Sequence, residues 1–424
     1  MFNISPFINN NFQNKELVNG RLWVCLAVLC VGLLPFGRSA EIPTAILAII
    51  GLLFLLKEET RAILKEPAVQ LFGLIFLLLW LPMVFSLYQS VDIERSLKTL
   101  LLYMRFLFLG VAIIVIFKNA KLKRQVLKWI SLAVFFWLAD SIFQLLSGVD
   151  ILGITYSGGR LSGPFNKLIM PVYMSVLLPF VLLYIARHYH QAVFIIAMIT
   201  VLCVLLLSGS RASFVVLGFG LSLFCYYCLR RGVKNFAPIM FGFVVLFLTV
   251  GAIGVNVHSG IKQRVDATLN IVSNDYDEVN KATSYRLTIW HSAWDMSLDN
   301  LVTGVGVRNF RQKFHQYEAA DSPFRQRQVT HPHLFILETF AEMGLVGVFA
   351  AALVPFILLF FIAHQKVVLN YEAAISLISV MMVFFPLNTH VSLYGSTYSQ
   401  LAWFVVAMSC ACLLPAKQPR GHLI

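Results

Sequence analysis

Four short segments of the sequence place arginine or histidine among turn-forming residues. They are Arg-Leu-Ser-Gly-Pro-Phe at 160–165, Ser-Gly-Ser-Arg at 208–211, the segment that holds Arg286, and Thr-His-Pro-His at 330–333. A guanidinium group binds phosphate through two parallel hydrogen bonds, and a neutral imidazole accepts a proton near neutral pH. Together these residue types suit group transfer from a phosphorylated donor, with arginines stabilising a diphosphate leaving group.

Each segment also has a structural interpretation, and the sequence leaves both open. A tight turn whose Arg211 extends to lipid headgroups fits residues 208–211, and an ordinary turn-rich loop fits residues 160–165. Pro332 suits the first turn of a helix, which predicts that His333 lies at or near a helix N-terminus. The macrodipole disfavours imidazolium there, so His333 is either a general base or a bystander at a helix end.

Three acidic residues lie inside apolar runs. Glu338 and Glu342 are one helical turn apart in the run after His333, and Asp140 is alone in another run. Carboxylates inside a membrane are costly and usually face a cavity or a partner. We expect a supporting role for Glu338, whereas Asp140 is either a polar contact between helices or a proton site.

The sequence offers no convincing set of metal ligands. Asp275 and Asp277 have an Asp-x-Asp spacing, but they lie in a polar stretch remote from the arginines. His331 and His333 are two residues apart and would point to different faces of a helix. We therefore expect no metal ion and no cofactor.

The composition shows what kind of chain must position these residues. Of 424 residues, 59% are apolar and 12% are charged, and the mean hydropathy is +0.79. A soluble domain has about 45–50% apolar and about 25% charged residues, so a soluble enzyme is excluded. The net charge of +13 then reflects basic residues retained on the cytoplasmic side of a membrane, not nucleic-acid binding.

Uncharged runs long enough to cross a bilayer, roughly 20 residues each, number about twelve. Their cores are residues 22–36, 42–56, 71–88, 100–117, 129–146, 168–186, 192–207, 212–229, 238–255, 334–363, 373–387 and 401–414. Basic residues gather in alternate connections, around residues 57–65, 118–128, 187, 230–234 and 366. This alternation predicts that both termini are cytoplasmic.

We expect an all-α polytopic membrane protein in three parts. These are a bundle of about nine spans over residues 1–255, a periplasmic loop over 256–332 and about three spans over 333–424. In the loop, residues 284–298 have Leu287, Trp290, Ala293, Trp294 and Ser297 on one helical face, and residues 309–320 suggest a second helix. The first helix is expected in the membrane interface, with Arg286 near lipid headgroups.

In combination, the segments resemble the O-antigen ligase family, within the superfamily of O-antigen ligases, O-antigen polymerases and bacterial O-oligosaccharyltransferases. The resemblance extends over essentially the whole chain. It rests on residues 160–165, residues 208–211, and His333 followed by Glu338, Gly344 and Gly347 after one large loop.

The resemblance implies a metal-independent, inverting glycosyltransferase of the polytopic C-type group in the bacterial inner membrane. Such an enzyme moves a glycan from undecaprenyl diphosphate to the lipid A-core acceptor at the periplasmic face, in lipopolysaccharide biosynthesis. His333 matches the essential histidine, and Arg211 and Arg286 match arginines that hold the donor diphosphate. Arg160 is expected to bind the diphosphate with them. Supporting positions are Glu338 and His331, whereas Leu334 stands where members commonly have asparagine.

Two other functions remain open. An O-antigen polymerase uses the same donor but takes a second lipid-linked glycan as acceptor. A transporter or flippase, in contact with membrane lipids like any polytopic protein, would also have about twelve spans. Two features argue against this class: no repeat relates the two halves of the chain, and the polar residues are concentrated in one loop.

Overall fold

The computed structural model describes residues 16–58, 60–156, 160–233, 236–257, 262, 265–266, 268–320, 322–388 and 391–413. These residues form helices and one isolated β-bridge, between Val149 and Thr155. The protein is an all-α polytopic membrane protein, which confirms the predicted fold class.

The helices of the bundle are α1 (Glu16–Gly32), α2 (Glu41–Leu56), α3 (Pro67–Phe85), α4 (Ile93–Tyr103), α5 (Arg105–Lys118), α6 (Ala120–Ser147), α7 (Met170–His188), α8 (Gln191–Ser208), α9 (Arg211–Arg230), α10 (Phe236–Val257), α15 (Phe335–His364), α16 (Tyr371–Val383) and α17 (Ser396–Leu413). The long connection holds η5 (Asn270–Val272), α12 (Tyr276–Ala282), α13 (Arg286–Asp299) and α14 (Phe310–Tyr317). Short 3-10 turns are η2 (Leu34–Ala40), η3 (Arg61–Lys65) and η4 (Ser86–Gln89).

Within the described residues, nine helical stretches are long and apolar enough to cross a membrane. One of them, Ile93–Lys118, combines α4 and α5, and two shorter apolar helices are Gly20–Gly32 and Tyr371–Val383. Every apolar run marked in the sequence falls on a helix, including α10 with its 22 residues.

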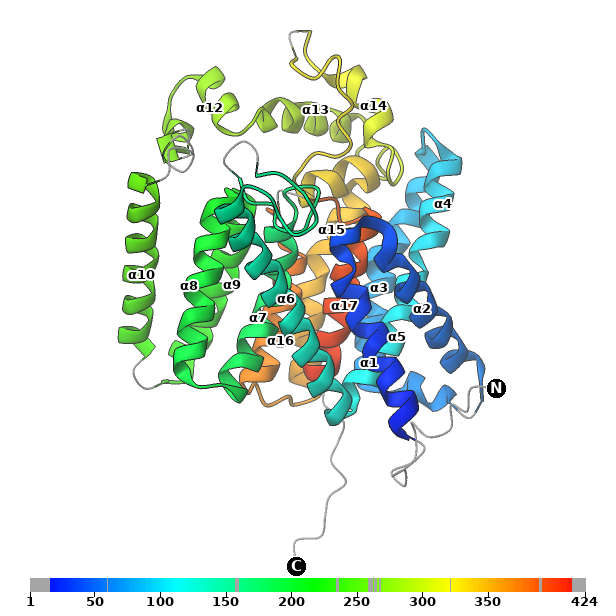
Figure 1. The fold of residues 1–424 in the computed structure, drawn as a ribbon. Helices are drawn as coiled ribbons and strands as arrows, with labels where there is room; N and C mark the ends of the chain where they lie inside the picture. Colours follow the sequence, from blue (N-terminus) through cyan, green and yellow to red (C-terminus); the bar gives the residue numbers. More distant parts are fainter. Residues whose placement is uncertain are drawn as a thin grey trace, which may run out of the picture.

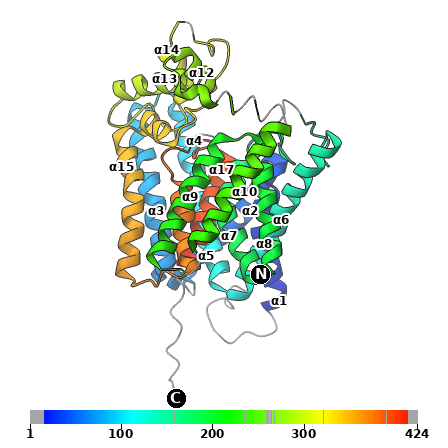
Figure 2. The same ribbon diagram turned by 90° about the vertical axis from the view of Figure 1, so that its left-hand side faces the viewer.

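The bundle helices stand side by side, and α12, α13 and α14 lie across one end (Figure 1). Figure 2 shows the same arrangement from the side. The connections that follow α2, α5, α7, α9 and α15 lie at the opposite end, where α1 begins and α17 ends (Figure 1). The described basic connections therefore share one end of the bundle, in agreement with the predicted alternation.

Helix α17 is the centre of the bundle. From Tyr398 to Leu413 each of its residues is buried. Trp403 packs against Phe76 with ring centroids 4.9 Å apart, and its Nε1 donates to the hydroxyl of Tyr103 at 2.9 Å. Aromatic packing thus fixes α17 against α3 and the α4–α5 span.

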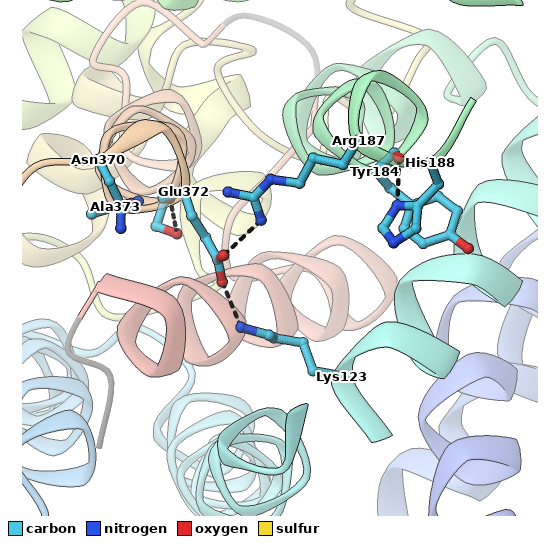
Figure 3. A network of polar contacts seen from close by, with 8 residues as sticks. Lys123, Tyr184, Arg187, His188, Asn370, Glu372 and Ala373 are labelled. Carbon is cyan, nitrogen blue, oxygen red and sulfur yellow. Dashed lines mark hydrogen bonds and ion pairs between the residues drawn. The ribbon is translucent and has the colours of Figure 1, made fainter. Parts of the chain in front are cut away.

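An ion-paired cluster joins three helices at the basic end of the bundle (Figure 3). Glu372, at the start of α16, accepts from Lys123 of α6 at 2.6 Å and from Arg187 of α7 at 2.8 Å. Each cation here has a carboxylate partner, so this cluster contributes to helix packing.

The two helices expected in the long connection are present as α13 and α14. The predicted face of α13 is only partly right. The buried apolar residues are Ile289, Ala293 and Met296, whereas Trp294 is 49% exposed. Contacts with α15 decide which face of α13 is buried, because Ile289, Ala293 and Met296 form one buried cluster with Ala341 of that helix.

Candidate active site

Arg211 is the first residue of α9 and extends toward the long connection. Residues 208–211 form a tight turn, in which Gly209 has a φ of +63° and ends α8. The Arg211 guanidinium donates to the carbonyl of Ala282 and to the hydroxyl of Ser284, at 3.1 Å. Residues 208–211 therefore form the expected turn, whereas the Arg211 guanidinium contacts residues more than 70 positions away in the long connection and its role in binding phosphate stays a prediction.

Arg286 begins α13 directly after two residues in the left-handed region. Ser284 has a φ of +61° and Tyr285 a φ of +59°, a conformation that costs non-glycine residues about 1–3 kcal/mol each. Burial, together with the charges of Arg211 and Arg160, lowers the pKa of Arg286 to about 10. All three arginines selected from the sequence therefore lie close together.

The loop that carries Arg160 is fixed to two helices. The Leu161 N–H donates to the carbonyl of Leu207, near the end of α8, at 3.3 Å. The Gly163 N–H donates to Oε1 of Gln144, on α6, at 3.1 Å. Gly163 has a φ of +53°, which explains a glycine at this position. The motif at 160–165 thus anchors the loop that presents Arg160.

Among the described residues, no carboxylate forms an ion pair with Arg160, Arg211 or Arg286. Three neighbouring cations repel one another, and partial burial removes part of the water that would screen them. An anion with several oxygens would relieve this repulsion and accept hydrogen bonds from more than one guanidinium. The arrangement therefore favours the binding of an anion.

His333 lies two residues before α15, in the left-handed region with a φ of +54°. The prediction that His333 is near a helix N-terminus is confirmed, but the placement of Pro332 in the first turn is wrong. Leu334 is extended, and the N–H of Phe335 donates to the carbonyl of Asn388 at 3.0 Å. This long-range hydrogen bond makes the helix start after the proline.

The two histidines contact one another, with ring centroids 4.0 Å apart. The expectation that they point to different faces of a helix is wrong, because neither lies in a helix. Nε1 of Trp290 donates to the carbonyl of Pro332, between them, at 3.1 Å. Since Trp290 follows Arg286 by about one turn of α13, one helix holds both Arg286 and the histidine segment.

Two other acids considered in the sequence have structural contacts. The Asp140 carboxylate accepts from the N–H of Ile151 at 2.8 Å, which fits a polar contact. The Asp275 carboxylate caps α12 by accepting from the N–H groups of Asp277 and Glu278. Within the described residues, no group of three or more His, Cys, Asp or Glu side chains is placed to hold a metal ion.

Glu338 belongs to a separate polar network. It accepts a hydrogen bond from the hydroxyl of Ser392, and Nη1 of Arg308 donates to the same hydroxyl at 3.2 Å. The Glu342 carboxylate accepts from the Arg308 N–H at 2.7 Å. Both glutamates are at most 2% exposed, so they face partners, as expected, but their partners are Arg308 and Ser392.

Residues 196–352 match the model of a family described as O-antigen ligase. The matched region starts in α8, contains Arg211, Arg286 and His333, and ends in α15. This part of the chain is therefore similar to the O-antigen ligase family. A comparison with curated proteins finds no match. The family match supports a glycosyltransferase-type enzyme of lipopolysaccharide biosynthesis, of the O-antigen ligase or polymerase kind.

Sequence reasoning missed Arg308 and Ser392. Ser392 lies 84 positions from Arg308, and no local pattern relates the two residues. The available signal was the spacing of Gly304 and Gly306 before Arg308. Their φ values are +66° and +98°, and they let the chain approach α15 closely.

That approach occurs at a kink in α15. Gly344 has a φ of +62° and interrupts the hydrogen bonds of the helix. The Val305 N–H donates to the carbonyl of Ala341 at 2.9 Å, and the Leu345 N–H donates to the carbonyl of Leu301 at 2.8 Å. Residues 301–306 therefore replace hydrogen bonds that α15 loses, which ties the long connection to this span.

We expect Gly344→Ala to destabilise the protein by at least about 1–3 kcal/mol, the cost of a left-handed non-glycine residue. In addition, a Cβ here would lie 2.2 Å from the carbonyl oxygen of Val302. Thermal unfolding of the purified protein in detergent measures the effect. Gly218→Ala in α9, where a Cβ meets nothing within 4 Å, is the control, and equal melting temperatures for the two variants would contradict the prediction.

Proposed function

We propose that the protein is an O-antigen ligase that transfers a glycan from undecaprenyl diphosphate to the lipid A-core acceptor. The observation that carries this proposal is the convergence of Arg160, Arg211 and Arg286, with no ion-paired carboxylate among the described residues. A diphosphate accumulates negative charge as it leaves, and fixed guanidinium groups stabilise that charge. A lipid-linked diphosphate is therefore the donor that fits the site.

In the proposed reaction, an acceptor hydroxyl attacks the anomeric carbon of the donor sugar. The bond from that carbon to the diphosphate oxygen breaks, and its electron pair stays on undecaprenyl diphosphate beside Arg211 and Arg286. His333 accepts the proton of the attacking hydroxyl, while its contact with the His331 ring orients it. Attack opposite to the leaving group inverts the anomeric configuration.

The distribution of basic residues supports an inner-membrane orientation. The start of α6, which holds Lys123, and the end of α7, which holds Arg187, lie at the end opposite α13 (Figure 1). Short connections rich in lysine and arginine remain cytoplasmic. The three arginines and His333 would then face the periplasm, and both termini the cytoplasm. The cytoplasm supplies ATP and the periplasm does not, so an already activated donor suits this side.

Expression of the gene in a host that lacks its own ligase and makes a compatible core tests the proposal. Long glycan bands on lipid A-core, resolved on a gel, are expected. If these bands are absent and lipid-linked chains lengthen, the protein is a polymerase. If a substrate crosses the membrane without glycan transfer, the protein is a transporter and the proposal fails.

We expect the purified enzyme to keep its transfer activity in EDTA, because arginines are proposed to neutralise the diphosphate. Initial rates with and without chelator measure this. A magnesium-dependent glycosyltransferase that uses a lipid diphosphate, assayed in the same buffer, shows that chelation is effective. Activity that disappears in EDTA and returns with magnesium would refute the metal-independent mechanism.

A further inference from the structure

Arg211 and Arg286 meet at the turn between α12 and α13. From α9, Arg211 donates to the carbonyl of Ala282 and to the hydroxyl of Ser284. Arg286 follows at once after the left-handed residues Ser284 and Tyr285. The relative position of the two guanidinium groups therefore depends on the shape of this turn.

Asn280 is a buried residue that forms hydrogen bonds across the turn. Its side chain and backbone are 6% exposed, and its carbonyl accepts from the Tyr285 N–H at 2.6 Å. Its Nδ2 donates to Oγ1 of Thr288 at 2.8 Å, and its Oδ1 accepts from the Thr288 N–H at 3.4 Å. Arg286 thus lies between two positions, Tyr285 and Thr288, that are both bonded to Asn280.

The turn must also hold Arg286 against repulsion. The charges of Arg211 and Arg160 act on Arg286, and unconstrained side chains of like charge would move apart. A site whose donors are already in place when the ligand arrives binds more tightly, because less ordering is needed on binding.

We propose that Asn280, Ser284 and Thr288 are positioning residues for the donor diphosphate, because they fix Arg286 relative to Arg211. The inference rests on the proposed function, since it assigns the turn to binding of undecaprenyl diphosphate. These residues act through the two arginines and do not take part in the chemical step. Their loss therefore weakens donor binding and leaves acceptor binding unchanged.

Thr288→Val tests the inference, because valine keeps the branched shape and removes the hydroxyl that accepts from Asn280. We expect about a tenfold higher donor KM, the size of effect typical when a buried donor loses its partner. Binding of sugar-free undecaprenyl diphosphate should weaken by a similar factor, with acceptor KM and kcat at saturating donor unchanged. Thr288→Ser, which retains the hydroxyl, should restore donor KM.

Ser297→Ala is the matched control, because this buried hydroxyl on the same helix donates to the carbonyl of Ala293, away from the turn, at 2.6 Å. Its donor KM should equal that of the wild type. If Thr288→Val does not accumulate in membranes, Ser284→Ala at an exposed position replaces it, with an expected rise in donor KM of about threefold.

The outcomes separate this inference from the function on which it rests. A folded Thr288→Val or Ser284→Ala variant with wild-type donor KM and wild-type probe binding overturns the positioning role, while transfer by the wild type still supports the ligase. A wild-type protein that neither transfers glycan nor binds undecaprenyl diphosphate overturns both.

Discussion

Replacing His333 with alanine is expected to lower the rate of glycan transfer about 10²–10⁴-fold, the usual contribution of a general base. The acceptor hydroxyl would then have to lose its proton to water during attack. Lipopolysaccharide from a ligase-deficient host, compared at matched membrane levels of wild type and variant, gives the first measurement. Initial rates with purified protein give the magnitude.

His333→Asn distinguishes loss of the general base from damage to the backbone conformation at this position. The residue has a φ of +54°, and asparagine tolerates the left-handed region better than alanine does. The asparagine variant should therefore accumulate like the wild type and still be inactive. His331→Ala should show a smaller loss, because the His331 ring contacts His333 but is not proposed to accept the proton. Wild-type glycan bands from both His333 variants would show that this residue is not the base.

Arg211→Lys and Arg286→Lys are each expected to lose most activity, about 10–100-fold, although the charge is kept. An ammonium group cannot reproduce the planar fork that binds two phosphate oxygens at once. At position 211 it also loses the paired contacts with Ala282 and Ser284. With a pKa of about 10, Arg286 is a cation at neutral pH, so the effect reflects geometry.

Rates at saturating acceptor and varied donor measure the loss in the two lysine variants. Arg187→Lys is the control, because Arg187 pairs with Glu372 at 2.8 Å at the opposite end of the bundle (Figures 1 and 3). It should transfer glycan at nearly the wild-type rate. Near-normal turnover of both Arg211→Lys and Arg286→Lys would remove the proposed diphosphate site.

Much of the fold could be predicted because the membrane imposes a simple length rule on apolar runs. The proximity of Arg160, Arg211 and Arg286 could also be predicted, since alternating spans bring their connections to one end of the bundle. The chemical roles of these residues, and the division of the chain at 255 and 332, stay predictions.

The details that could not be predicted depend on long-range contacts. At the start of α15, the N–H of Phe335 bonds to the carbonyl of Asn388. The preference of proline for the first turn of a helix takes no account of such a distant partner. The pairing of Glu338 with Ser392 spans 54 positions. The contact between the His331 and His333 rings also depends on the left-handed backbone of His333. A sequence pattern that assumes a helix cannot predict this conformation.

The central position of α17 has a consequence for the synthesis of the protein. Among the described helices, α17 follows all the others in the sequence, and it supplies the centre of the bundle, where Trp403 packs against Phe76 of α3 and bonds to Tyr103 of α4. The helices before it therefore lack their central packing partner until α17 has been synthesised and inserted. Insertion of α17, and not of the first spans, is therefore the step that completes the core of the bundle.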